Sequence, residues 1–428
     1  MKSNVKIIKI GSILLVGSVA NHLLSFIVRI RYMRHDYLKD DEYAEFLLGW
    51  ISFQIAVLLI HLNLYAPMGS KYQSNMNKLA LQTDISNILK YILPWSLIVA
   101  ISYYIVLSFL GLNQFTKITF SIAVIFFGIF ILIQSLQKAI GQFSVVTLEF
   151  GSIGFLRLVF LIIFLVLNLK TIEIAIIIYL LPIICISIIS LILFKKQNQM
   201  NYNINSSNYK ELAIYLNQSK WVIISDITFN LTIFMSVYFL KEGQKLPEIE
   251  LFDVIITSIS MISLLITNYG YAILLKAPKI STTALFKWIF KRFAFPFTVI
   301  AIIVGYIIHQ FQILDYIITN IIKLEFESSF VLIVLLSLTP IIQTTSIILS
   351  SYIQGRGYFS FDSLGRVIGL IMALTFGILN IKSLINSFII IFIYFLFQIL
   401  FISFFFIFFV GKANGDIVNG ELKTTKEN

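Results

Sequence analysis

Seven residues are selected from the polar and ionisable residues that lie inside long apolar stretches, where such groups are costly and therefore informative. They are His22, Arg29, His61, Arg157, Asp226, Tyr271 and Gln343. An ionisable group in lipid costs from about 2.5 to over 10 kcal/mol, so it faces the interior of a helix bundle or reaches back to an interface. These seven residues are the candidate lining of a polar substrate cavity, and we assign a catalytic role to none of them.

Each of the two arginines has two open interpretations. Arg29 is followed by further arginines, and the acids in residues 36–42 could neutralise all of them. Alternatively Arg29 turns inward to bind a phosphate, because the planar guanidinium matches phosphate oxygens. Arg157 lies seven residues after Phe150, so its long side chain either snorkels to the interface or faces a cavity.

The other five candidates divide in the same way. Asp226 is too short to snorkel far, so it is either a structural partner of another helix or a cavity group that couples transport to an ion. His22 and His61 either bond to a neighbouring helix or line a cavity. The same alternatives hold for Tyr271 and Gln343, because polar side chains commonly bond between membrane helices.

Several classes of chemistry have no signal in the sequence. There is no GxxxxGK[ST] loop, which argues against ATP hydrolysis of the P-loop kind. None of the four histidines has metal-ligand spacing to a second His or to Cys185, so we expect no metal and no cofactor. A single cysteine excludes a disulfide framework. We therefore expect a transporter rather than an enzyme.

The composition indicates the elements that must position these residues. Of the 428 residues, 58% are hydrophobic and 12% are charged, against about 25% charged in soluble domains. A membrane-spanning helix needs about 20 apolar residues. Twelve such runs predict an all-α polytopic membrane protein: 10–30, 45–66, 91–110, 118–137, 150–169, 173–194, 220–240, 253–275, 293–314, 328–353, 363–381 and 383–410. Prolines that could bend helices lie in four of them, at Pro94, Pro182, Pro296 and Pro340.

The distribution of charge predicts the orientation. The net charge of +11 would suggest nucleic acid on a soluble protein, but here most Lys and Arg residues fall on one side of the predicted crossings. The positive-inside rule then places both termini in the cytoplasm, and we expect no nucleic-acid partner. The polar segment 195–218 divides the chain into six-helix bundles at 1–194 and 219–410, with a tail at 411–428.

Two short matches indicate that the bundles are pseudo-repeats. Ala66-Pro67 closes the second run and Ala277-Pro278 closes the eighth. Gly141-Gln142-Phe143-Ser144 follows the fourth run, and Gly357-Tyr358-Phe359-Ser360 follows the tenth. Because each half has an even number of helices, such repeats would be related by an axis along the membrane normal.

This layout resembles the polysaccharide or O-unit flippase family (Wzx-like) of the multidrug/oligosaccharidyl-lipid/polysaccharide exporter (MOP) superfamily. The likeness rests on the Asp41-Glu42-Tyr43-Ala44-Glu45-Phe46 step, the Leu64-Tyr65-Ala66-Pro67 close and the two Gly-x-Phe-Ser turns. It covers residues 5–410 in layout. It implies two bundles facing each other in a MATE-like V around a central cavity, with Arg29 in the position of a cavity arginine.

The resemblance also implies a function. The chain would move an undecaprenyl-diphosphate-linked oligosaccharide from the inner to the outer leaflet of the bacterial cytoplasmic membrane, by alternating access, for export of O-antigen or capsule. Its partners would be this lipid-linked oligosaccharide, membrane lipid, and the glycosyltransferases and polymerase of the same pathway. A drug/cation antiporter of the same superfamily, a membrane oligosaccharide polymerase and a non-transporting assembly scaffold remain alternatives.

Overall fold

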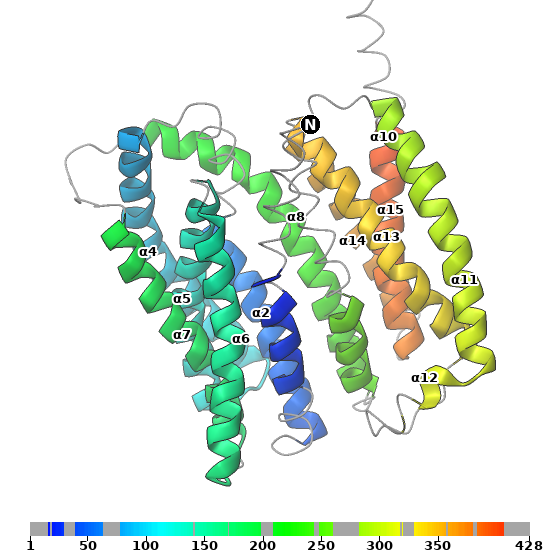
Figure 1. Cartoon of the computed structure of the whole chain (residues 1–428), viewed down its shortest axis with the longest axis horizontal. Coiled ribbons are helices and arrows are strands. Elements are labelled where there is room, and N and C mark those ends of the chain that lie inside the picture. The colour runs from blue at the N-terminus through cyan, green and yellow to red at the C-terminus, as the bar shows by residue number, and fades with distance from the viewer. Residues whose placement is uncertain are drawn as a thin grey trace, which may run out of the picture. The chain divides into compact units, whose positions relative to one another are not determined.

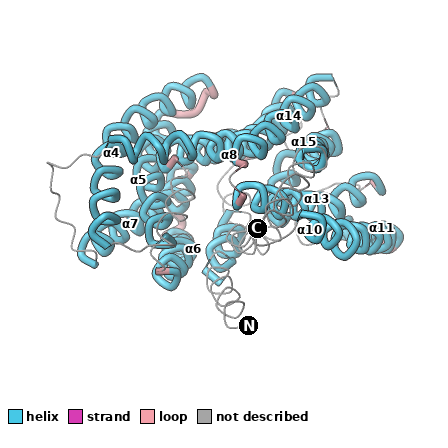
Figure 2. The backbone as a smooth tube through the Cα atoms, turned by 90° about the horizontal axis from the view of Figure 1, so that it is seen from above, coloured by secondary structure: helices cyan, strands magenta, loops and turns pink. Residues whose placement is uncertain are grey.

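The computed structural model describes most of the chain, and the described residues are helices joined by short connections. They are residues 16–17, 19–29, 39–62, 78–139, 142–169, 171–197, 209–243, 248–259, 282–316, 319, 329–356, 358–379 and 383–405. No strand occurs in these ranges (Figure 2). The expected all-α class is therefore confirmed.

The chain folds as two compact units. The first contains Met1–Tyr269 with Ile381–Ser387, and the second contains Gly270–Asn380 with Phe388–Asn428. The first unit includes the helical residues 19–29 and 248–259 and six long helices (Figure 1). These are α2 (Asp40–His61), α4 (Lys78–Phe109), α5 (Gln114–Ala139), α6 (Phe143–Val166), α7 (Ile172–Gln197) and α8 (Tyr209–Glu242). The predicted boundaries at 194 and 219 stay a prediction.

Helix α5 is the centre of the first unit. It packs against α2, α4, α6 and α7, and α2 also packs against α8. Its apolar residues include Ala123, Phe130 and Ile133, all fully buried. Each of α2, α6 and α7 therefore uses one face to pack against α5. Other residues of the same three helices line a cavity.

The second unit is built around α13. Its elements are α10 (Thr282–Trp288), the π-helical turn η3 (Ile289–Ala294), α11 (Phe295–Gln310), α12 (Ile313–Tyr316), α13 (Phe330–Gly355), α14 (Phe359–Leu379) and, from Phe388 onward, α15 (Leu384–Phe405). Ser329 caps α13 by accepting a hydrogen bond from the Leu332 amide at 3.2 Å. Small residues recur every fourth position on α14, so that Gly369 lies directly against the Tyr394 carbonyl of α15.

Ten of the described helices are long and apolar enough to cross a membrane. They correspond to ten of the twelve predicted runs. The other two runs, 10–30 and 253–275, are only partly described and are helical over 19–29 and 248–259. The count of twelve crossings and the cytoplasmic termini stay predictions.

The prolines are accommodated in two ways. Pro94, Pro182 and Pro340 lie inside α4, α7 and α13, which continue through them. Pro296 lies in the first turn of α11, immediately after the π-helical turn η3. A proline removes one backbone hydrogen bond and crowds the preceding turn, and the wider π-turn relieves that crowding.

The Gly-x-Phe-Ser motifs occupy equivalent places. Phe143 is the first residue of α6 after α5 ends at Ala139, and Phe359 is the first residue of α14 after α13 ends at Gly355. The Phe-Ser pair of each motif thus opens the following helix, and Gly141 and Gly357 lie outside the described residues. The Ala66-Pro67 and Ala277-Pro278 pairs lie outside the described residues.

Glycines bring the helical residues 19–29 against α6. A Cβ added at Gly154 would lie 2.9 Å from the Asn21 Cα and 3.2 Å from the Asn21 carbonyl oxygen. Only glycine allows two membrane helices to approach this closely. Arg157 follows Gly154 by one helical turn, so this approach brings its guanidinium within reach of Ser25.

Gly154→Ala should lower the stability of the purified protein in detergent. The added methyl meets the Asn21 backbone, and overpacking of this kind typically costs about 1–3 kcal/mol. Gly151→Ala on the same helix is the matched control, because its Cβ would meet nothing within 4 Å. A melting temperature for Gly154→Ala as high as that of Gly151→Ala would contradict the described packing.

Candidate functional site

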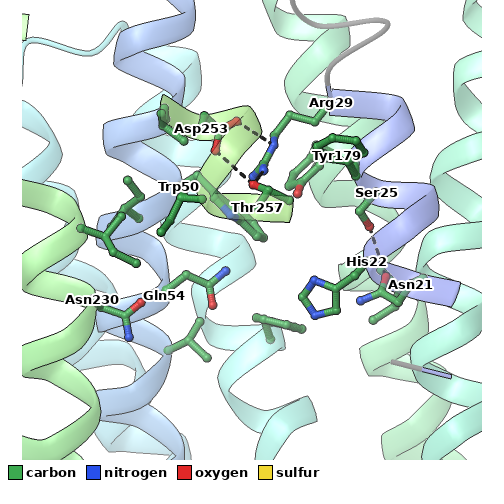
Figure 3. A pocket seen from close by; sticks show the side chains of 18 of the residues that line it. Asn21, His22, Ser25, Arg29, Trp50, Gln54, Tyr179, Asn230, Asp253 and Thr257 are labelled. Atoms are coloured by element: carbon green, nitrogen blue, oxygen red, sulfur yellow. Dashed lines mark hydrogen bonds and ion pairs between the residues drawn. The ribbon is translucent and has the colours of Figure 1, made fainter. Parts of the chain in front are cut away.

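A cavity of about 420 Å³ lies inside the first unit. Residues 19–29, α2, α5, α6, α7, α8 and residues 248–259 all contribute to its lining. Its walls are largely aliphatic and aromatic. The polar groups facing it are Asn21, His22, Ser25, Arg29, Gln54, His61, Arg157, Tyr179, Asn230, Asp253 and Thr257 (Figure 3). An apolar pocket of this volume with a few convergent polar groups is typical of small-ligand sites.

Arg29 is held by an ion pair deep in the cavity wall. Its Nε lies 3.1 Å from the Asp253 Oδ2, and the two side chains are 7% and 3% exposed. Its terminal nitrogen also donates to the Thr257 hydroxyl, one helical turn after Asp253 (Figure 3). The Tyr43 hydroxyl donates to the same Asp253 oxygen. The charge of Arg29 is therefore compensated locally.

Arg157 is also buried in the cavity wall, but its partners are neutral. Its Nε donates to the Tyr179 carbonyl oxygen at 3.0 Å, and a terminal nitrogen donates to the Ser25 hydroxyl. The guanidinium carbon lies 3.8 Å from the centroid of the Tyr179 ring and 5.8 Å from that of Trp50. Within the part of the chain that the structure describes, Arg157 has no carboxylate at ion-pair distance. It is 3% exposed.

Aromatic residues of α2 hold this arginine in place from one side. Phe46, Trp50 and Phe53 recur at helical spacing, so their rings share one face of α2. Trp50 stacks on Phe53 and meets Tyr179 edge-on, with ring centroids 5.1 and 4.7 Å apart. Phe46 also meets Tyr179 edge-on at 5.6 Å. The Tyr179 ring below Arg157 is thus fixed by two rings of α2.

Four of the seven predicted cavity residues line this pocket: His22, Arg29, His61 and Arg157. Two of the other three do not line it, and the third lies outside the described residues. Asp226 is half-buried on α8 and is not among the lining residues. Gln343 is buried on α13 in the second unit. Tyr271 lies outside the described residues. Whether any of them contacts a substrate stays a prediction.

Three residues of the Arg29 cluster escaped the sequence analysis: Asp253, Tyr43 and Thr257. We expected the eighth run to begin at 253 and did not single out Asp253, whereas the helix already covers 248–259. Tyr43 lies in the Asp41–Phe46 segment, before the predicted second run begins at 45. The helix α2 in fact begins at Asp40, so Tyr43 lies in its first turn. One signal in the sequence could have identified the cluster. Asp253 precedes Thr257 by one helical turn at the start of an apolar run, so the two polar side chains share one face of the helix.

The arrangement is suited to binding rather than to covalent chemistry. No group of three or more His, Cys, Asp or Glu residues that could hold a metal occurs among the residues that the structure describes. The cavity instead presents two guanidinium groups, two imidazoles and several amides and hydroxyls against aromatic walls. Such groups donate hydrogen bonds to anionic oxygens and to the hydroxyls of a ligand.

Comparison with solved structures identifies the fold. The eukaryotic MATE transporter AtDTX14 is 14% identical over 94% of this chain and 96% of its own, with a TM-score of 0.58. A mutant of the Vibrio cholerae MATE transporter VcmN is 11% identical over 93% and 94%, with a TM-score of 0.60. An inward-facing MATE transporter of the MOP superfamily is 14% identical over 95% and 96%, also at 0.60.

The chain has the MATE transporter fold. With ten membrane-capable helices in that fold, it is a multi-pass membrane protein. No protein-family model matches the sequence, and neither does any curated protein. At 11–14% identity the likeness describes the architecture, so the chemistry of the MATE-fold cavity has to be argued from its own residues.

Asp253→Asn should destabilise the protein strongly. It leaves the Arg29 guanidinium buried without a counter-charge, and removing one partner of a buried ion pair typically costs about 3–5 kcal/mol. Adding Arg29→Gln should recover much of that loss, because both charges are then absent. The test is a double-mutant cycle on unfolding in detergent, and simply additive losses would argue against the pair.

Proposed function

We propose that this protein is a MOP-superfamily transporter that moves an undecaprenyl-diphosphate-linked oligosaccharide from the inner to the outer leaflet of a bacterial cytoplasmic membrane. It would work by alternating access, with no covalent step. The observation that carries the proposal is Arg157, a buried cation in the cavity wall whose partners are all neutral.

The charge of the cavity favours an anionic ligand. Among the lining residues that the structure describes, the charged ones apart from the histidines are Arg29, Arg157 and Asp253. Asp253 balances Arg29, so one positive charge remains. A buried unpaired charge costs several kcal/mol, and an anion that accepts hydrogen bonds from Arg157 would remove that cost. A diphosphate supplies both the charge and the oxygen geometry that a guanidinium binds.

Arg29 could join such a ligand without leaving Asp253 stranded. If the guanidinium turned towards a diphosphate, Asp253 would still accept from the Tyr43 hydroxyl, and Thr257 lies 3.4 Å from its other oxygen. The carboxylate would therefore keep hydrogen bonds when its ion pair opened. Exchange of Arg29 between Asp253 and substrate would link ligand binding to the contact between residues 19–29 and 248–259.

The remaining lining suits the first sugars of a glycan. Gln54 and Asn230 present amides from α2 and α8, and Trp50 presents a ring (Figure 3). Amides bond to sugar hydroxyls, and aromatic faces pack against the apolar face of a pyranose. At about 420 Å³ the cavity accommodates a head group rather than a polyprenyl chain, which would stay in lipid.

A drug/cation antiporter is the second candidate, because the fold likeness to MATE transporters supports it equally well. An organic cation needs a carboxylate that is free to pair with it. The one acid among the described lining residues is Asp253, which is already paired with Arg29. The charge of the cavity therefore favours the flippase over the antiporter.

Arg157→Gln should weaken diphosphate binding about 10- to 100-fold, since a hydrogen bond to a charged group contributes about 1.5–3 kcal/mol. Inorganic diphosphate and undecaprenyl diphosphate can be titrated against the fluorescence of Trp50, 5.8 Å from Arg157, after the other three tryptophans are replaced by Phe. Arg157→Lys keeps the charge and should bind with intermediate affinity.

Lys117→Gln is the matched control, because it removes one positive charge over the Tyr104 ring, away from the cavity. Its affinity for diphosphate should equal that of the wild type. Equal affinity in Arg157→Gln, measured on folded protein, would remove the proposed role of Arg157. Saturable binding of organic cations without binding of diphosphate would favour the antiporter instead.

A further inference from the structure

A second polar cluster lies between α5 and α6, outside the lining of the cavity. Glu149 of α6 is 6% exposed, and its two carboxylate oxygens accept from the side-chain amides of Gln134 at 2.8 Å and Gln137 at 3.3 Å. The two glutamines are 1% and 0% exposed. They are three residues apart on α5, so both amides face the same side of that helix.

Among the described residues, no cation balances the buried carboxylate of Glu149. In the described part of the chain, no Lys, Arg or His lies within ion-pair distance of its carboxylate. Other buried acids are treated differently, because Asp253 pairs with Arg29 and Asp362 lies 3.6 Å from Arg366. Amide donors satisfy the geometry of the carboxylate but bring no net charge, and burying an unpaired charge remains costly.

The two glutamines add a second anomaly. The Oε1 atoms of Gln134 and Gln137 are both buried and have no hydrogen-bond partner among the described residues. A buried acceptor left unsatisfied costs about 1–3 kcal/mol. The cluster therefore combines a carboxylate without a counter-cation with two unused amide oxygens, which point away from that carboxylate because the amide nitrogens face it.

A half-turn of each amide converts this cluster into a cation site. The oxygen and nitrogen of a side-chain amide exchange places on rotation with almost no change in shape. Rotated amides would direct two carbonyl oxygens at the position between them and the carboxylate. The cation would then balance the charge of Glu149 and bind both oxygens, while the two Nε2 groups would give up their bonds to the carboxylate and take the places that the oxygens hold now.

We propose that Glu149, Gln134 and Gln137 form a binding site for a single Na⁺ ion. One carboxylate balances one positive charge, whereas a divalent ion would leave an excess charge buried. Carboxylate and amide oxygens are hard ligands that suit a hard cation rather than a transition metal. Four side-chain oxygens are few for a large ion, which favours Na⁺ over K⁺. The site stands apart from the cavity and does not depend on the transported substrate.

The proposal is tested by the thermal stability of the full chain in detergent. NaCl is exchanged for choline chloride at constant ionic strength and fixed pH, with KCl as a parallel series. The melting temperature should rise saturably with Na⁺, because a ligand that binds only the folded state stabilises it by mass action. Na⁺ should act at concentrations at least about tenfold lower than K⁺.

Variants assign the effect to the cluster. Glu149→Gln should abolish the Na⁺-dependent shift, and Glu173→Gln, which removes a carboxylate from the first turn of α7, should keep it. Gln134→Met keeps the carboxylate but removes one oxygen, and it should raise the Na⁺ concentration for half-maximal stabilisation at least about tenfold. If Glu149→Gln does not fold, the Gln134→Met variant still tests the proposal. Arg157→Gln should retain the full response to Na⁺, which separates this site from the proposed diphosphate site.

Three outcomes would overturn the proposal. The first is a wild-type melting temperature that is the same in Na⁺ and choline, which would leave the cluster a set of structural hydrogen bonds. The second is an undiminished Na⁺ response in both Glu149→Gln and Gln134→Met. The third is a stability that ignores Na⁺ but follows pH through Glu149, which would make the occupant a proton.

Discussion

A charge buried in an apolar helix bundle has to be balanced, and the first unit depends on how this is done for two arginines. Arg29 is balanced by Asp253, and the pair joins the segments 19–29 and 248–259, which are more than 200 residues apart in the sequence. Tyr43 brings the start of α2 to the same carboxylate. Three segments with little local reason to meet are thereby fixed at one point.

Arg157 shows the opposite solution. Its guanidinium is solvated by a carbonyl, a hydroxyl and the face of Tyr179. These groups orient the cation without cancelling it, because each contributes a dipole or quadrupole rather than a negative charge. The rings of α2 that contact Tyr179 and the close helix packing at Gly154 thus both position the guanidinium of Arg157. They hold a positive charge buried in the wall of the cavity.

The fold could be predicted from the sequence because it rests on lengths of apolar chain. Ten of the predicted runs match described helices, and even the turns at Phe143 and Phe359 fall where the motifs indicated. The candidate site could be predicted only in part. Arg29, Arg157, His22 and His61 stood out because each is polar within an apolar run, and that signal needs no partner.

The residues that were missed lie where helix boundaries were misjudged. Asp253 is the first residue of the predicted run 253–275, and Glu149 directly precedes the predicted run 150–169, and neither was among the candidates. The described helix around Asp253 already covers 248–252, and α6 begins at Phe143, so both acids lie within helices of the bundle. Hydropathy cannot detect this, because an acid lowers the local average that defines the boundary. Its burial is decided by a partner on another helix, such as Arg29 or Gln134.

The cavity and the Glu149 cluster share the same two helices, which gives the cluster a mechanical connection to the site. Glu149 and Arg157 are eight residues apart on α6, or about 12 Å along the axis. On α5, Phe127 and Ile131 line the cavity, and Gln134 follows Phe127 by two turns. The Phe130 and Phe150 rings pack edge-on between the two sites, with centroids 5.6 Å apart. The contacts between Glu149 and the two glutamines join α5 to α6 about two helical turns from Arg157. Because tightly packed helices transmit a change in spacing rather than absorb it, these contacts influence how closely the two helices pack near Arg157.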